Sequence, residues 1–343
     1  MTTLPLPGLR RRSDAFLRAR ELGIAMAIVL VFLVTWLQNS GFASDLSLQQ
    51  LFTGAALIAL LAVGETMVIV TRNVDLSVGS VLGLSAYLVG DFFKHHPHAP
   101  ILLGFLLGIG LGAAVGAVNG AITTLLRVPS LVVTLAALYI VRGILAVIVD
   151  GRRIESDSIP EGFQKIGYLT VPKLAWLPWL AVLVIVIVAI ATYAMKSFRW
   201  ARDIYAIGSN PDAAALAGLP VARRVFTAFV VSGALAGLGG ALFLAEFATV
   251  DSTGGNGYEL LVVSAVVVGG VAIFGGSGTV FGAALGAVLL NMINQALVAL
   301  QVSSFWTNAV AGGLLLAAIA FDRWVGLRVA LRLRTGGGGS HVG

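Results

Sequence analysis

The stretch Ser209-Asn210-Pro211-Asp212-Ala213-Ala214-Ala215-Leu216-Ala217-Gly218-Leu219-Pro220 contains its own helix start and stop signals. Ser209 or Asn210 can accept hydrogen bonds from the first free backbone N–H groups, and Pro211 suits the first helical position. Gly218 can end the helix because it adopts a left-handed backbone conformation without strain. The sequence therefore predicts a short helix over 211–217.

This stretch belongs to a hydrophilic segment, 199–224, between two long apolar runs. The 343-residue chain is 58% hydrophobic and only 11% charged, against roughly 25% charged residues in a soluble domain. Its mean hydropathy is +0.96, and its length suffices for about ten membrane spans of roughly 20 residues each. We predict an all-α fold, a polytopic transmembrane helical bundle of about ten spans. The short helix would lie outside the membrane, where another protein can dock.

The apolar runs mark the expected spans. They cover residues 22–38, 50–71, 77–93, 101–126, 129–149, 174–195, 225–247, 258–274, 279–300 and 304–321. The third run is short and contains Gly83 and Gly90, so we expect it to be broken or partly re-entrant. The first run favours an uncleaved anchor over a signal peptide, because the run and the polar region before it are both long for that role.

The distribution of positive charge predicts the orientation. With ten spans and the N-terminus inside, sixteen of the 22 Lys and Arg residues fall in the cytoplasm and five outside, and Arg142 lies within a span. This asymmetry follows the positive-inside rule and places segment 199–224 and both termini in the cytoplasm. The cations lie at the ends of apolar runs, so the net charge of +6 does not indicate nucleic-acid binding. We divide the chain into a basic cytoplasmic N-terminus (1–21), a membrane domain (22–325) and a basic, then Gly-rich, flexible tail (326–343).

Glycines recur every four residues along the fourth run and form one stripe on a helix. Such a stripe lets another backbone approach closely, so we expect tight helix packing here. The stripe consists of Gly104, Gly108, Gly112, Gly116 and Gly120, and the pairs Gly233/Gly237 and Gly282/Gly286 repeat its spacing.

The chain contains no recognisable cofactor site. Gly275-Gly276-Ser277-Gly278 is not followed by the Gly-Lys-Ser/Thr of a phosphate-binding loop, so ATP chemistry must come from a partner. His95, His96 and His98 lie together, but we expect a solvated loop and no metal site. There are no cysteines, and no nucleophile–base pair favours an enzyme.

Each ionisable group within a membrane span costs roughly 2.5–3.5 kcal/mol to insert. Such a group therefore indicates a structural or functional role. Glu65 lies late in the second run, Arg142 interrupts the fifth, and the polar break 72–77 follows the second. One interpretation is a polar pathway for a hydroxylated solute. The other is an internal ion pair, such as Arg142 with Glu65, together with amide bonds between helices. For the break itself we favour transport or gating, because irregular backbone survives in membranes only against protein or water.

Several blocks, in order over about residues 50–325, resemble the membrane permease subunits of bacterial sugar ABC importers of the ribose/xylose/arabinose type. They are Thr71-Arg72-Asn73-Val74-Asp75-Leu76-Ser77-Val78-Gly79-Ser80, Val128-Pro129-Ser130, Thr134-Leu135, Arg142-Gly143, residues 204–214, Gly255-Asn256-Gly257-Tyr258-Glu259-Leu260, Val268-Gly269-Gly270 and Gly275-Gly276-Ser277-Gly278. Two departures are Arg72-Asn73, in place of a small residue and glycine, and Ala136-Ala137, in place of Gly-Thr. The first resembles the rhamnose and furanone-autoinducer branches.

The resemblance implies a non-catalytic subunit in the bacterial inner membrane that carries a monosaccharide by alternating access. Its partners would be a cytoplasmic ATPase that uses ATP-Mg, an extracytoplasmic sugar-binding protein, and a second permease, identical or related. The expected pathway residues are Arg72, Asn73, Asp75, Ser77, Asn119, Thr134, Tyr258 and Glu259. The expected ATPase-coupling residues are Ile204, Tyr205, Gly208, Asn210, Pro211, Ala214, Ala215 and Gly218.

Two alternatives remain at this point. One is an ABC permease for branched-chain amino acids or nucleosides. The other is an ion-coupled secondary transporter, in which Glu65 and Asp75 would be the coupling groups. Segment 199–224 argues against the second alternative, because a self-powered carrier needs no docking segment.

Overall fold

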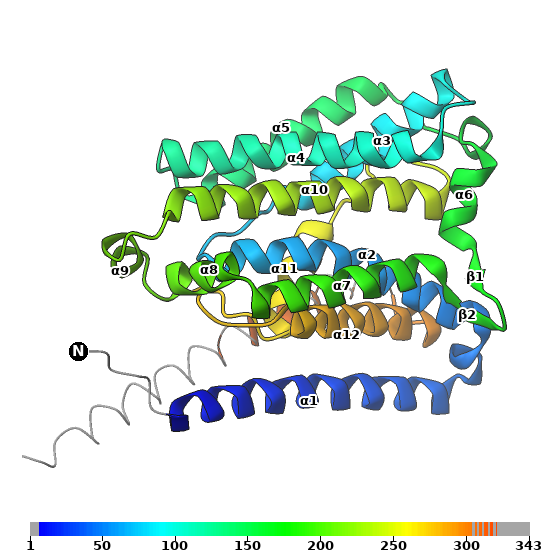
Figure 1. Ribbon diagram of the computed structural model, residues 1–343. Helices are drawn as coiled ribbons and strands as arrows, with labels where there is room; N and C mark the ends of the chain where they lie inside the picture. Colours follow the sequence, from blue (N-terminus) through cyan, green and yellow to red (C-terminus); the bar gives the residue numbers. More distant parts are fainter. Residues whose placement is uncertain are drawn as a thin grey trace, which may run out of the picture.

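A computed structural model describes residues 7–303, 306, 309, 310, 312–314, 316, 317 and 320, with side chains from Glu21 onward. It is a bundle of long helices whose axes run roughly side by side (Figure 1). We call its two ends the α9 end and the α6 end, after the helices that lie there. The elements are α1 (Pro7–Gln38), η1 (Ser40–Ala43), α2 (Asp45–Val70), α3 (Val78–His95), α4 (Ile101–Leu125), α5 (Ser130–Val149), η2 (Ser156–Ser158), α6 (Glu161–Tyr168), β1 (Thr170–Val171), β2 (Leu174–Pro178), α7 (Trp179–Ser197), α8 (Arg199–Ser209), α9 (Pro211–Leu216), α10 (Val221–Phe247), α11 (Tyr258–Val268) and α12 (Val280–Ala299).

The described residues form seven helices that are long and apolar enough to cross a membrane. These are α2, α4, α5, α7, α10, α12 and the part of α1 from Glu21 to Gln38. Of the other predicted runs, 77–93 forms α3 and 258–274 forms only the short α11. Half of the last run, 304–321, lies outside the described residues, and the tail 326–343 lies wholly outside them.

Two predictions about helix continuity were wrong. The third run is not broken: α3 is continuous from Val78 to His95. Its glycines serve close packing instead, because a methyl group at Gly83 would collide with the Gly254 carbonyl and one at Gly90 with Ile154. The break falls in the run 258–274, where α11 ends at Val268 and a glycine-rich loop follows.

Helix α2 forms the centre of the bundle and packs against α7, α10, α11 and α12. It is 94% buried over its spanning window, whereas α4 and α5 are 22% and 28% buried. An all-round apolar helix such as α2 suits a position enclosed by other helices. The outer helices instead turn large apolar side chains outward, among them Leu131, Tyr139 and Val147 of α5.

The glycine-stripe prediction is confirmed. Helix α4 lies along α10, where added methyl groups at Gly108, Gly112 and Gly116 would each collide with an α10 backbone carbonyl. Gly286 makes the same kind of contact with the Ala265 carbonyl of α11, and Gly282 makes it with the carbonyl of Gly269, the C-cap of α11. Backbones therefore approach closely at both places, as small-residue packing in membranes requires.

Candidate functional site

Residues 71–77 connect α2 to α3 and fold back into the bundle. The backbone N–H of Asp75 donates to Glu65 Oε1 at 3.1 Å. The Asp75 carboxylate accepts from the Ser77 hydroxyl at 2.6 Å and the Ser77 N–H at 3.0 Å. Glu65, Asp75 and Ser77 are at most 1% exposed, so the connector satisfies its own backbone with side chains where no water is available.

Three helices close this network. Asn119 of α4 donates to Ser77 Oγ at 2.9 Å, and Ser232 of α10 donates to Asp75 Oδ2 at 3.3 Å. Thr134 of α5 donates to the Val74 carbonyl at 3.1 Å. We call Glu65, Asp75, Ser77, Asn119 and Ser232 the connector network. The Glu65 Oε2 atom is buried and has no hydrogen-bond partner among the described residues.

A second polar group lies where loop 248–257 meets α3 and α5. Arg142 of α5 donates to the Gly254 carbonyl at 2.5 Å, and its Nη2 atom lies 3.8 Å from Glu259 Oε2. Neither Arg142 Nη2 nor Glu259 Oε2 has a hydrogen-bond partner in the described part of the chain. Their side chains are 15% and 18% exposed, although the Nη2 and Oε2 atoms that face each other are buried.

The sequence-based suggestion that Arg142 pairs with Glu65 was therefore wrong. Arg142 faces Glu259, and Glu65 belongs to the connector network. The reason is topological: α3 lies next to α5 and α11, and its Gly79 and Gly83 leave room for the side chains of Glu259 and Arg142. Sequence spacing alone does not show which of two carboxylates lies beside the arginine.

The predicted short helix is confirmed as α9, Pro211–Leu216. Asn210 is its N-cap and accepts from the Ala213 N–H at 3.0 Å, and Pro211 is the first helical residue. Gly218 has a φ of +78°, which ends the helix. Ala214 faces inward at 5% exposure, whereas Leu216 is 91% exposed. The sequence did not identify Leu216 as exposed, because an apolar residue in a short helix normally packs against the rest of the protein.

Helix α8 attaches α9 to the bundle. Ile204 and Ile207 are at most 1% exposed, and a methyl group at Gly208 would collide with the Val70 carbonyl. Burial raises the pKa of Tyr205 to about 12, so its hydroxyl stays protonated, and it donates to the Gly278 carbonyl at 2.9 Å. Ile204, Tyr205 and Gly208 thus hold the segment, and the exposed surface comes from α9.

Arg72 joins the connector to this segment. Its Nε donates to the Gly208 carbonyl at 2.5 Å and its Nη2 to the Ser209 carbonyl at 2.6 Å. These carbonyls lie at the C-terminus of α8, the negative end of its dipole, where a guanidinium is favoured. Next to this contact, the Gly276 N–H donates to the Val70 carbonyl at 2.9 Å. The end of α2, the end of α8 and loop 269–279 therefore meet at one junction.

The structure divides the eight predicted pathway residues. Asp75, Ser77, Asn119 and Thr134 lie in or against the connector network, and Asn73 donates to Thr71 beside it. Arg72 points the other way, toward α8. Tyr258 and Glu259 begin α11, and the Tyr258 ring packs against Phe243 at 6.1 Å between centroids.

Residues 47–319 match the family described as Branched-chain amino acid transport system / permease component. The chain belongs to this permease family. It is 34% identical to the Autoinducer 2 import system permease protein LsrC of Photorhabdus luminescens, over 88% of this chain and 89% of the relative. The proteins of the same name from Salmonella typhimurium and Escherichia coli O157:H7 are each 32% identical, over 88% and 92% of this chain and 85% and 90% of the relative. No solved structure matches the chain.

The permease is thus a multi-pass membrane protein of the ABC transporter type. Resemblance to the sugar permeases, with the autoinducer branch among them, is confirmed at the level of the family and its named relatives.

Proposed function

We propose that the permease is the transmembrane subunit of an ATP-driven importer in the bacterial inner membrane. Its solute would be a sugar-like, hydroxylated molecule of the furanone-autoinducer kind. Support comes from the three autoinducer 2 permeases, each of which aligns over at least 85% of its length. A cytoplasmic ATPase and an extracytoplasmic binding protein complete the importer, as does a second permease subunit, identical or related.

The geometric observation that carries the proposal is α9. It is capped at Asn210, held by α8, and presents Leu216 with 91% of its surface exposed at the end of the bundle. On this short capped helix, Leu216 and the exposed alanines beside it offer apolar surface that a partner protein can bury. In the proposed importer the ATPase closes on ATP, presses on α9, and moves the α2–α8 junction through Arg72.

The solute would meet Arg142 and Glu259 first. A guanidinium and a carboxylate that lack hydrogen bonds to each other can donate to and accept from the hydroxyl groups of one molecule. The connector network would then form the seal that opens toward the α9 end. Among its buried side-chain atoms in the described structure, only Glu65 Oε2 lacks a hydrogen-bond partner.

The test is uptake into proteoliposomes that contain the permease, its ATPase and its binding protein. We expect accumulation of labelled autoinducer 2 that requires ATP and the ATPase, with weaker competition by ribose and none by leucine. Accumulation by the permease alone, driven by an ion gradient, would exclude the proposal.

Docking at α9 has its own test, Leu216→Ser. Removing this exposed leucine should weaken ATPase binding about tenfold, the size expected for a buried apolar contact worth about 1.4 kcal/mol. Leu46 is 65% exposed near the α6 end, so Leu46→Ser is the matched control and should leave ATPase binding unchanged. Equal binding by wild type and Leu216→Ser would place the dock elsewhere.

A further inference from the structure

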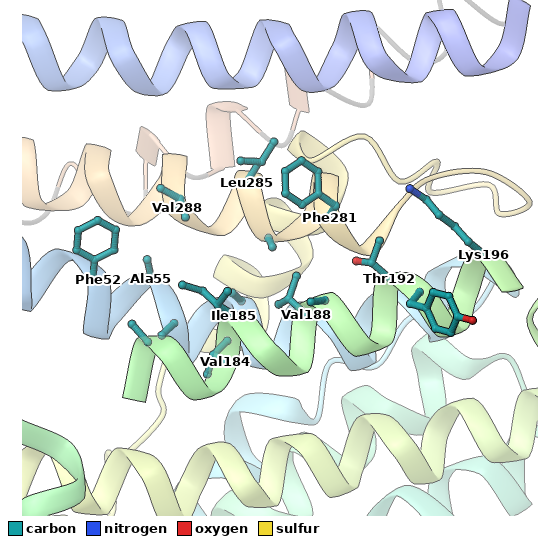
Figure 2. A pocket seen from close by; sticks show the side chains of 16 residues that line it. Phe52, Ala55, Val184, Ile185, Val188, Thr192, Lys196, Phe281, Leu285 and Val288 are labelled. Atoms are coloured by element: carbon teal, nitrogen blue, oxygen red, sulfur yellow. The ribbon is translucent and has the colours of Figure 1, made fainter. Parts of the chain in front are cut away.

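An apolar groove of about 560 Å³ runs between α2, α7 and α12. Figure 2 shows Phe52 and Ala55 of α2 at one end, Val184, Ile185 and Val188 along α7, and Phe281, Leu285 and Val288 of α12 opposite them. The groove lies apart from the connector network and from the Arg142–Glu259 pair, none of whose residues line it. The transport proposal therefore leaves it unexplained.

The groove opens on the outer surface of α7. Ile185 and Tyr193 both line it, and they are 57% and 66% exposed. In a membrane-spanning helix, exposed apolar surface of this kind suits contact with acyl chains and does not favour water.

Polarity is confined to one end of the groove. Thr192, Tyr193 and Lys196 line it at the α9 end, and the remaining lining residues are apolar. The Thr192 hydroxyl oxygen is buried and makes no hydrogen bond within the described residues. Figure 2 shows Lys196 at this end of the groove. An ammonium at the mouth of an apolar groove complements a molecule with an anionic head and a hydrocarbon tail.

The length of the groove also suits a hydrocarbon tail. The lining residues of α7 run from Ala181 to Lys196, about 22 Å at 1.5 Å per residue. A lipid tail that spans one leaflet, about half of the ~30 Å hydrocarbon core, fits in it lengthwise.

We propose that this groove binds one anionic glycerophospholipid, with its tail between α2, α7 and α12 and its phosphate against Lys196. Helix α7 continues through Phe198 into α8. A bound lipid therefore adjoins the segment that carries α9, and it couples membrane composition to the position of that segment. This site is independent of which solute the permease carries.

The test uses the full chain in bilayers with equal amounts of phosphatidylglycerol and phosphatidylcholine. After mild detergent extraction, native mass spectrometry counts the lipids that remain bound. We expect phosphatidylglycerol to exceed phosphatidylcholine about fivefold, as one basic residue predicts for a net anionic head group against a zwitterionic one. Lys196→Gln should reduce the ratio to about one, while Arg202→Gln, an exposed cation outside the groove, should leave it unchanged.

A second pair of variants tests the tail. Ala189→Phe fills the groove and should abolish retention of both lipids, whereas Val186→Phe, on the outer surface of α7 away from the groove, should retain them. Size-exclusion profiles establish that each variant is folded. Equal retention of the two lipids by wild type, no retention at all, or wild-type behaviour of Lys196→Gln or Ala189→Phe would each overturn the proposal.

Discussion

The permease interrupts its helices at connector 71–77 and at loop 248–257, and the two interruptions treat their polar groups differently. In the connector, Asp75 accepts from Ser77 and Ser232, and Ser77 accepts from Asn119. Beside the loop, Arg142 and Glu259 lie 3.8 Å apart with a free donor and a free acceptor in the described structure. In the connector network only Glu65 Oε2 has no partner among the described residues, and the other hydrogen bonds fix one conformation. The charged pair instead retains a donor and an acceptor that a ligand can use.

The two groups of polar residues, which were assigned to one pathway from the sequence, therefore have different roles. The connector network belongs to the machinery that holds α2, α3, α4 and α10 in register. The Arg142–Glu259 pair is the better candidate for contact with the solute. Substitutions that remove the charge of a side chain but keep its shape should therefore have different effects on stability and uptake at the two interruptions.

The largest effect is expected at Asp75. Asp75→Leu leaves the Ser77 and Ser232 donors buried without an acceptor, which should cost about 3 kcal/mol of stability. Denaturant unfolding in detergent micelles measures the loss, and uptake should fall with it. Asp75→Asn is the matched control: its carbonyl can accept from Ser77 and its amide can donate to Ser232, so stability and uptake should stay close to wild type.

The Asp75→Asn variant also shows whether Asp75 belongs to a seal or to an ion-coupling site. An ion-coupled carrier needs the negative charge of Asp75, so Asp75→Asn would abolish uptake there while leaving the fold intact. Lost uptake in a stable Asp75→Asn variant would thus reverse the roles that we assign to the two interruptions.

A smaller effect on stability, but a clear effect on transport, is expected at the second interruption. The double variant Arg142→Met/Glu259→Gln removes both charges together, so no unpaired buried charge remains and the fold should tolerate it. Uptake at low solute concentration should fall about tenfold, equivalent to about 1.4 kcal/mol of lost recognition. A concentration series at fixed ATP shows whether KM rises, as solute contact requires. Unchanged KM would make the pair a structural one.

The sequence predicts part of this arrangement well. Residues 209–218 contain every signal for α9, because capping depends on neighbours in the chain. The glycine spacing predicts the α4 stripe for the same reason, since helical periodicity is local. The partner of Arg142 depends on how α3, α5 and α11 pack, and no local signal distinguishes Glu65 from Glu259. Helix α8 was missed within a segment treated as polar, although Ile204 and Ile207 lie one turn apart on its buried face.

The smallest effect is expected at Arg72, where the connector meets α8. Arg72 donates to the carbonyls of Gly208 and Ser209 through two different nitrogens, whereas a lysine has one and cannot reproduce both contacts in the same geometry. Arg72→Lys should leave stability unchanged, because the contact lies at an exposed position. The ATP hydrolysed per solute transported should rise about threefold, since a loosened contact transmits less of the motion of α9 to the connector. The measurement is the ratio of ATPase to uptake rates in the same proteoliposomes. An unchanged ratio would mean that α9 acts on the bundle by another contact, for which Tyr205 to the Gly278 carbonyl is the next candidate.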